Sequence, residues 1–151
     1  MSYIMTKEER EAFLADLHVG ILSVVTPDRG PVSVPIWYIY QPGGELFFCS
    51  VKSGRKVEMI RSAGRLTVCV VIEKPPSKYV SVEGVLISIE PCDLERDQRP
   101  IARRYLGVDK GDQYTEEVKT TEEMVTIRMK PEHWSSADYS KQPSLIARKD
   151  V

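Results

Sequence analysis

Three apolar segments separated by two tight turns open the chain, and they limit the fold to one built on antiparallel strands. His18–Thr26, Pro31–Tyr40 and Glu45–Ser50 are rich in β-branched and aromatic residues, which favour strands. The connections Pro27–Gly30 and Gln41–Gly44 are short, and both place Pro and Gly at turn positions. Connections this short join antiparallel neighbours, so we expect a three-stranded meander.

Three further strands are expected later in the chain. Arg65–Ile72 is almost continuously apolar, which indicates a strand that is buried on both faces. Lys78–Glu90 reads as a long strand, and Gly84 within it indicates a β-bulge or a sharp bend. Met124–Met129 alternates in polarity, and Pro131 is expected to end that strand.

Helices are expected around these six strands. The capping-box spacing that starts at Thr6 predicts an N-terminal helix over residues 1–17. Three other segments have helical patterns, the last of them weak: Ser53–Gly64, Pro100–Leu106 and Asp109–Thr121. Because strands and helices do not alternate, the pattern favours a mainly antiparallel β-barrel with peripheral helices over a doubly wound sheet. Pro35 cannot donate to a strand ladder, so it marks an edge, a bulge or a gap that faces a ligand.

The chain of 151 residues fits one domain, with a tail over residues 142–151 that we expect to be loose. Its formal net charge of -1 argues against a nucleic-acid partner. Cys49, Cys69 and Cys92 show no CxxC spacing, so we expect reduced, buried thiols in a cytoplasmic protein. No membrane span and no signal-peptide pattern are present, and no membrane partner is expected.

The most promising chemistry lies where the third strand runs into a helix. Ser53 is expected to cap this helix, and Arg55 and Lys56 fall in its first turn, beside backbone N–H groups that have no helical partner. Such a site can bind phosphate. Cations oppose the helix dipole at this end, which an anion would offset. The alternative is that both cations are simply solvated on a surface helix, and spacing alone does not favour either interpretation.

Other chemical signals are weak or absent. The common nucleotide-binding fingerprints are missing, and the two histidines, His18 and His133, are too few for a histidine metal site or a Ser-His-Asp triad. No metal is expected. Trp37 shares a strand face with Ile39 and suits either the core or the wall of a site for a flat ring. Trp134 suits a pocket cover, a subunit interface or a packed terminal flap.

The order of these features resembles the flavin and deazaflavin oxidoreductases of the pyridoxamine 5′-phosphate oxidase-like superfamily. The resemblance extends from about Leu17 to Lys141. The segments that carry it are Leu46–Ser50, Ser53–Lys56, Arg65–Val68, Tyr79–Gly84, Arg104–Gly107 and Pro131–Lys141. The resemblance implies a six-stranded antiparallel split β-barrel of the FMN-binding type, and a homodimer whose cofactor cleft lies at the subunit interface.

The resemblance also implies roles for individual residues. Arg55 and Lys56 match the pair that holds the cofactor phosphate, with Ser50 and Ser53 as small polar positions around it. The strand Val34–Trp37 matches the one whose backbone flanks the ring. The expected cofactor-binding residues are Val34, Pro35, Ile36, Trp37, Ser50, Ser53, Arg55, Lys56, Tyr79 and Trp134.

Two of these residues come from later strands. Tyr79 matches a polar residue that contacts the ring or the phosphate, and Trp134 matches an aromatic near the shared cleft. The chain departs from the vitamin B6 oxidases at Ser33, where they carry an Arg for the flavin, and it lacks their substrate segment rich in Arg and His. Met59 stands where some deazaflavin enzymes have Asn.

We therefore expect a reductase that transfers hydride between coenzyme F-420 or FMN and a small organic acceptor. No catalytic side chain is assigned, because the ring performs the chemistry in such enzymes. The alternative is a non-catalytic protein on the same barrel that binds or sequesters a flavin, a deazaflavin or a tetrapyrrole. A weaker alternative is a protein-interaction barrel whose basic turn has no ligand.

Overall fold

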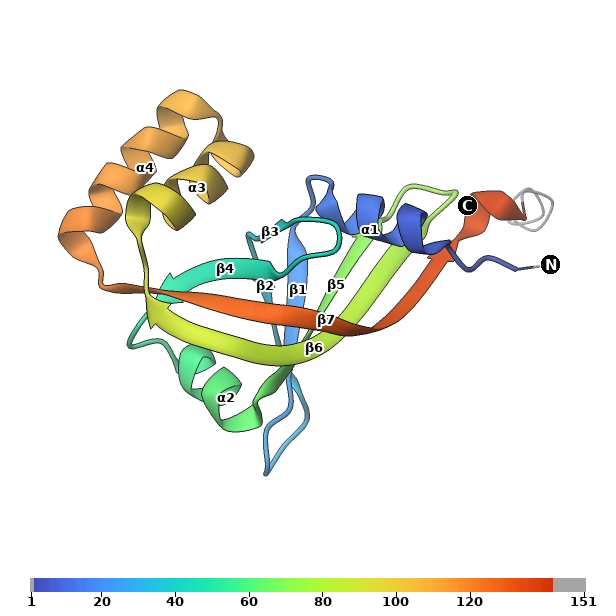
Figure 1. Ribbon diagram of the computed structural model, residues 1–151, viewed down its shortest axis with the longest axis horizontal. Coiled ribbons are helices and arrows are strands. Elements are labelled where there is room, and N and C mark those ends of the chain that lie inside the picture. The colour runs from blue at the N-terminus through green and yellow to red at the C-terminus, as the bar shows by residue number, and fades with distance from the viewer. Residues whose placement is uncertain (1, 143–151) are drawn as a thin grey trace.

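The computed structural model describes residues 2–142, which form a seven-stranded antiparallel sheet with helices at its margins (Figure 1). The strands follow the order β2-β1-β5-β6-β7-β4-β3 across the sheet. The strands are β1 (Gly20–Val24), β2 (Val32–Ile36), β3 (Ile39–Tyr40), β4 (Leu46–Val51), β5 (Arg65–Ile72), β6 (Lys78–Pro91) and β7 (Met124–Asp138). The helices are α1 (Lys7–Ala15), α2 (Arg55–Ala63), the π-helix η1 (Leu94–Gln98), α3 (Arg99–Leu106), α4 (Val108–Thr121) and the 3₁₀-helix η2 (Tyr139–Lys141).

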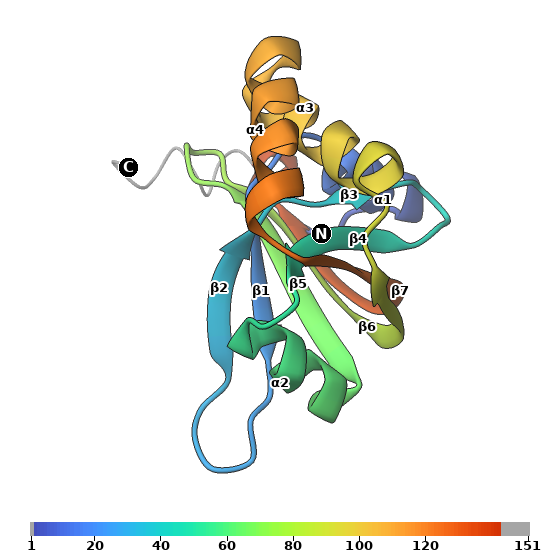
Figure 2. The same cartoon turned by 90° about the vertical axis from the view of Figure 1, so that its left-hand side faces the viewer.

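The long strands β6 and β7 hold the two parts of the sheet together. They pair with each other over almost their whole length, while β6 also pairs with β5, and β7 also pairs with β4. The sheet is strongly curved, so that β1, β2 and β5 run across the direction of β4 and β7 (Figure 2). No helix among residues 2–142 is long and apolar enough to cross a membrane.

The chain closes this curved sheet by crossing from one edge to the other. The edge strands β2 and β3 are separated only by Trp37 and Tyr38. Ile36 is the last residue that pairs with β1, and Ile39 is the first that pairs with β4. The single strand expected over Pro31–Tyr40 is therefore two strands, and the expected six strands become seven. The fold is the expected mainly antiparallel split barrel, and Pro35 lies on an edge strand, as its missing N–H group requires.

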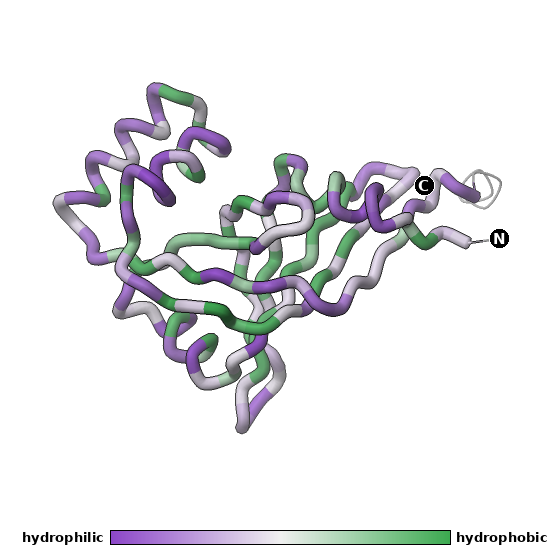
Figure 3. Tube along the Cα trace, viewed as in Figure 1, coloured by the Kyte–Doolittle hydropathy of each residue, from purple (hydrophilic) through white to green (hydrophobic). Residues whose placement is uncertain are grey.

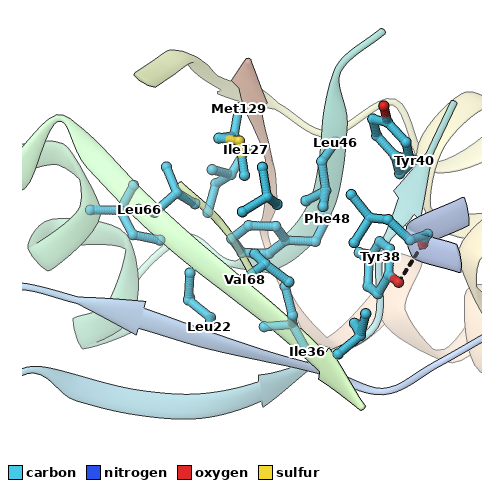
Figure 4. Close-up of a cluster of buried hydrophobic side chains, with 14 of the residues drawn as sticks. Leu22, Ile36, Tyr38, Tyr40, Leu46, Phe48, Leu66, Val68, Ile127 and Met129 are labelled. Atoms are coloured by element: carbon cyan, nitrogen blue, oxygen red, sulfur yellow. Dashed lines mark hydrogen bonds between the residues drawn. The ribbon is translucent and has the colours of Figure 1, made fainter. Parts of the chain in front are cut away.

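Apolar side chains fill the inside of the barrel. Phe48, Val68 and Ile127 are fully buried at its centre (Figure 4). Helices α1 and α2 add Leu14 and Ile60 to the same core. Hydrophobic stretches follow the strands, whereas α3 and α4 are largely hydrophilic (Figure 3). The core is thus built by the sheet and its two flanking helices, with the α3–α4 pair outside it.

Two expectations about the later strands are wrong. β5 is not buried on both faces: its residues alternate, and Val71 on the outer face is 49% exposed. Pro131 does not end β7, which continues to Asp138 and includes Trp134. Pro131 lies beyond Met129, the last β7 residue that pairs with β4, and it faces the β6 bulge at Gly84. A strand tolerates proline in both settings.

The expected ends of the first two helices are partly confirmed. Thr6 and Glu9 form the capping box: Thr6 Oγ1 accepts from the Glu9 N–H group at 3.2 Å, and the Glu9 carboxylate accepts from the Thr6 N–H group at 2.8 Å. Helix α1 nevertheless ends at Ala15, short of residue 17. Helix α2 ends at Gly64, which has a left-handed φ of 68°. Of the tail expected over residues 142–151, only Gln142 lies within the described residues.

The bulge at Gly84 gives a direct test of the packing between β6 and β7. A Cβ atom at Gly84 would lie 2.2 Å from the Lys130 carbonyl oxygen and 2.3 Å from the Met129 sulfur. We expect Gly84→Ala to lower the free energy of unfolding by about 2 kcal/mol in urea titrations. Gly30→Ala is the control, because a Cβ there would meet no atom within 4 Å, and a change of at most about 0.5 kcal/mol is expected. Equal losses in the two variants would contradict close packing at the bulge.

Candidate functional site

A cavity of about 270 Å³ lies at the split of the barrel. Its walls come from the edge strand β2, from the first residue of β7, from β4 and from the first turn of α2, while η1, α3 and α4 cover it. The lining residues are Pro35, Ile36, Trp37, Cys49, Lys56, Gln98, Ile101, Tyr114 and Met124. Segments far apart in the sequence thus meet where the chain crosses from β2 to β3.

Trp37 is held in place by two aromatic side chains of the helical pair. Its ring stacks on that of Tyr105, with centroids 5.0 Å apart and planes within 3°, and the Tyr114 ring lies at 6.2 Å. The Tyr105 hydroxyl donates to the His18 carbonyl at 2.6 Å and accepts from the Tyr38 N–H group at 3.2 Å. These contacts fix a flat aromatic surface at the cavity wall.

A buried carboxylate connects η1, the short helix that leads into α3 and α4, to the sheet. Asp97 of η1 is 1% exposed, and it accepts from Arg96 Nε at 2.8 Å, from Thr126 Oγ1 at 2.8 Å and from Arg128 at 3.2 Å. Burial by itself would raise the pKa of Asp97, but the hydrogen bonds from Arg96 and Thr126 and the two positive charges together lower it. The ionised carboxylate therefore joins η1 to β7.

Gln98 follows directly and brings an unsatisfied group to the site. Its side chain is 3% exposed, it lines the cavity, and its Oε1 atom accepts no hydrogen bond from the described residues. Buried acceptors without a partner are rare in folded proteins because each costs about 1–3 kcal/mol. A bound molecule with an N–H group would supply the missing donor.

The start of α2 carries both expected cations, although its cap differs from the expectation. Gly54, not Ser53, is the N-cap, and no side chain in the described part of the chain accepts from the N–H groups of the first turn. Arg55 is exposed, whereas Lys56 is half-buried. Among residues 2–142, no carboxylate forms an ion pair with either cation, and burial lowers the pKa of Lys56. The Val57 N–H group of this turn donates to the Gly54 carbonyl at 3.2 Å, so positive charge coincides here with N–H groups that have no side-chain cap among the described residues.

The two cations point to different sides of the helix. Lys56 lines the cavity at the barrel split. Arg55 lines a second cavity, of about 310 Å³, together with the loop between β1 and β2. The first turn of α2 thus stands between the two cavities.

Comparison with known proteins assigns the family. The sequence profile described as pyridoxamine 5′-phosphate oxidase matches residues 6–137. The chain belongs to this family. Among curated proteins, none matches the chain at a significant level.

Solved structures show the same fold at low sequence identity. A conserved hypothetical protein from Mycobacterium tuberculosis is 22% identical over 94% of this chain and 90% of its own, with a TM-score of 0.77. An F-420 reductase is 23% identical, with coverages of 83% and 94% and a TM-score of 0.66. A FAD-binding protein from Mesorhizobium loti is 23% identical, with coverages of 87% and 92% and a TM-score of 0.56.

Four of the ten residues expected from the family resemblance meet in the cavity, namely Pro35, Ile36, Trp37 and Lys56. Arg55 lies on the far side of the same helical turn, and the exposed Ser53 precedes it. Val34 packs against the core and Ser50 is 6% exposed, and neither lines the cavity. In β4 the side chain that reaches the cavity is the neighbouring Cys49.

The last two expected residues lie elsewhere in the single chain. Trp134 packs edge-on against Tyr40 at 6.0 Å, with the Arg10 guanidinium 4.8 Å above its ring. Tyr79 lies on the outer face of β6, and its hydroxyl is 3.4 Å from Ser135 Oγ. Neither residue lines the cavity at the barrel split within one chain.

Several cavity residues were not expected from the sequence. Gln98 belongs to a π-helix that no local pattern predicts, and Tyr114 belongs to a charged helix with a weak pattern. A buried polar residue such as Gln98 leaves no local signal, because its burial depends on contacts made elsewhere in the fold. For Tyr114, an aromatic in a charged helix was the one available hint.

Lys56 gives a prediction about stability and pH. We expect Lys56→Met to raise the free energy of unfolding at pH 7 by about 0.5 kcal/mol, because the variant removes a half-buried charge without an acidic partner. The pKa of Lys56 is lower in the folded chain than in the unfolded chain, so the cost is present below that lowered pKa. It fades as the pH rises towards the ordinary value of about 10.4.

Urea titrations at neutral and alkaline pH measure this difference. Arg55→Met is the matched control, because Arg55 is exposed and adjacent, and no gain in stability is expected from it. A loss of stability in Lys56→Met at pH 7 would show that the ammonium group is satisfied in the fold.

Proposed function

We propose that this family member is an oxidoreductase that binds coenzyme F-420 or FMN and transfers hydride to a small organic acceptor, in the cytoplasm. The observation that carries the proposal is Lys56, a half-buried cation in the cavity without an acidic partner among the described residues. The family assignment and the fold shared with an F-420 reductase and a FAD-binding protein support a cofactor of the flavin type.

The first turn of α2 suits the cofactor's phosphate. Lys56 would donate from one side and Arg55 from the other, with the uncapped N–H groups between them. Residues 2–142 contribute no carboxylate to the walls of the main cavity, whereas Asp28 and Glu58 line the second cavity beside Arg55. The phosphate would offset the burial of the Lys56 ammonium.

The remaining walls suit a flat, partly polar ring. The edge backbone from Pro35 to Trp37 would run along the ring, and the Gln98 oxygen would accept from a ring N–H group. Ile36, Ile101 and Met124 would exclude water. A flavin or deazaflavin ring supplies the hydride chemistry when bound. The chain's own residues bind and orient it, and no side chain is assigned as a general acid or base.

The site would be completed by a second copy of the chain. The cavity of about 270 Å³ is just below the lower limit of about 300 Å³ for ligand pockets. Beside it, the outer face of β1 and β5 exposes Ile21 and Val71 by 40% and 49%. Ile21 pairs directly with Pro35, so this apolar face extends to the cavity. We propose that two chains pack through it, which would also bury the outer side of β5 and place Tyr79 at the interface.

Binding titrations test the cofactor site. F-420 and FMN are titrated side by side, and the preferred cofactor is then titrated into variants. Arg55→Ala and Lys56→Ala are each expected to weaken binding about 10- to 100-fold, the loss of one charge-assisted hydrogen bond. Arg61→Ala is the matched control, because Arg61 lies in the last turn of α2 and pairs with Glu58 at 3.6 Å. Unchanged affinity in the double variant for both cofactors would refute the site.

Turnover separates an enzyme from a carrier protein. The complex with reduced cofactor is mixed rapidly with quinones and other small organic acceptors. Reoxidation of the ring that is faster than for free cofactor supports the reductase. Tight binding without faster reoxidation by any acceptor would favour a protein that binds or sequesters the cofactor.

The proposed subunit interface gives a separate prediction. Ile21→Asp is expected to convert the dimer into a monomer in sedimentation experiments, because it places a charge in an apolar contact. Val108→Asp is the control: Val108 is 59% exposed at the start of α4, away from this face. A wild-type protein that sediments as a monomer would refute the interface and leave the phosphate site to be judged by the titrations.

A further inference from the structure

Two cysteines from distant parts of the chain face each other beside the cavity. Cys49 Sγ lies 3.4 Å from Cys92 Sγ, although the residues are 43 positions apart in sequence. Cys49 lies in β4, and Cys92 directly follows the end of β6, so the two thiols come from the two sides of β7. The Thr126 hydroxyl of β7 lies 3.6 Å from Cys49 Sγ.

The backbone segments that carry Cys49 and Cys92 differ in how firmly the surrounding structure holds them. Cys49 is held within β4 by pairing with Thr126. Cys92 belongs to the short link between β6 and η1, and its N–H group donates to the Met124 carbonyl at 3.0 Å. A disulfide requires a sulfur–sulfur distance of about 2.05 Å, so the sulfurs must approach by about 1.4 Å. A link outside regular structure can make that movement.

The thiols also differ in acidity. A hydrogen bond from Cys49 lowers the pKa of Cys92 to about 7, although burial and the charges of Asp97 and Asp93 oppose this. The same hydrogen bond, followed by burial, raises the pKa of Cys49. One sulfur is therefore favoured as a thiolate, and the other is a thiol within reach of it.

We propose that Cys92 and Cys49 form a reversible redox pair whose oxidant is a hydroperoxide. The Cys92 thiolate attacks one peroxide oxygen and breaks the O–O bond; it becomes a sulfenic acid, and the other oxygen leaves as water or an alcohol after taking a proton. The Cys49 sulfur then attacks Cys92 Sγ. The disulfide forms, and the hydroxyl group of the sulfenic acid leaves with the Cys49 proton as water. A small dithiol restores both thiols and is itself oxidised to a disulfide.

The position of the pair links its oxidation state to the cavity. Cys49 lines the cavity, and Cys92 lies two residues before η1, which carries Gln98. A disulfide between Cys49 and Cys92 would attach the link that precedes η1 and α3 to β4. The inference depends on these two residues alone and does not require that the chain bind F-420 or FMN.

Mass spectrometry of the intact protein tests the pair. Fully reduced wild type and Cys69→Ser are treated with hydrogen peroxide at pH 7. Cys69 is the control cysteine, because it lies in β5 and burial raises its pKa. We expect both proteins to lose the mass of two hydrogen atoms, with Cys49 and Cys92 joined in the peptide map, and a dithiol to reverse the change. Cys49→Ser is expected to accumulate a sulfenic acid on Cys92 that a cyclic dione captures, and Cys92→Ser to form no intramolecular disulfide.

Alkylation rates provide a second measurement that needs no variant. In the reduced wild type at pH 7, we expect iodoacetamide to modify Cys92 at least about tenfold faster than Cys69, because only Cys92 is substantially ionised. The proposal is overturned if peroxide adds oxygen atoms to the wild type without joining the two residues. It is also overturned if iodoacetamide modifies Cys92 and Cys69 at equal rates.

Discussion

The crossing of the chain from β2 to β3 is the constraint on which the rest of the structure depends. Tyr38, at the centre of the crossing, is fully buried, and its hydroxyl donates to the Leu14 carbonyl of α1 at 2.6 Å (Figure 4). Its N–H group donates to the Tyr105 hydroxyl of α3. A buried hydroxyl without a partner costs about 1–3 kcal/mol, so these bonds fix the crossing against both helices. The side chain of the preceding residue, Trp37, points away from that of Tyr38 and lines the cavity.

The parts of the fold that the sequence predicts well are those governed by neighbouring residues. The loops between β1 and β2 and between β3 and β4, the capping box at Thr6 and the left-handed Gly64 depend on local propensity and turn chemistry, and they appear at the expected places. The expected three-stranded meander is wrong, because β2 and β4 lie apart in the sheet. The break between β2 and β3 and the continuation of β7 through Pro131 depend on which strand lies opposite. A single sequence carries no direct record of that pairing, so these features were misjudged.

The same distinction applies to the candidate site. Lys56 could be picked out because a strand, a polar turn and a helix follow one another locally. Gln98 could not, because it reaches the cavity only through its neighbour Asp97, which bonds to Thr126, 29 positions further along the chain. Cys49 and Cys92 carry no spacing motif either, and only the folding of β4 and β6 around β7 brings their sulfurs together. The family resemblance predicted that the backbone around Trp37 forms a wall of the site. Strand propensity alone did not decide whether Trp37 lies in the core or in a site.

Arg55 and Lys56, at the start of α2, lack the ion pairs that several other cations form within residues 2–142. Acidic and basic residues are nearly balanced, at 22 and 21, so carboxylates are not scarce. Arg65 bonds two of them and Arg99 bonds three. Glu58 lies in the first turn of α2, yet it pairs with Arg61. Within residues 2–142, positive charge without an ion pair, N–H groups without a side-chain cap and a cavity wall therefore coincide at one helical turn. The half-buried charge of Lys56 and the uncapped N–H groups are locally unfavourable, and one bound anion would offset both.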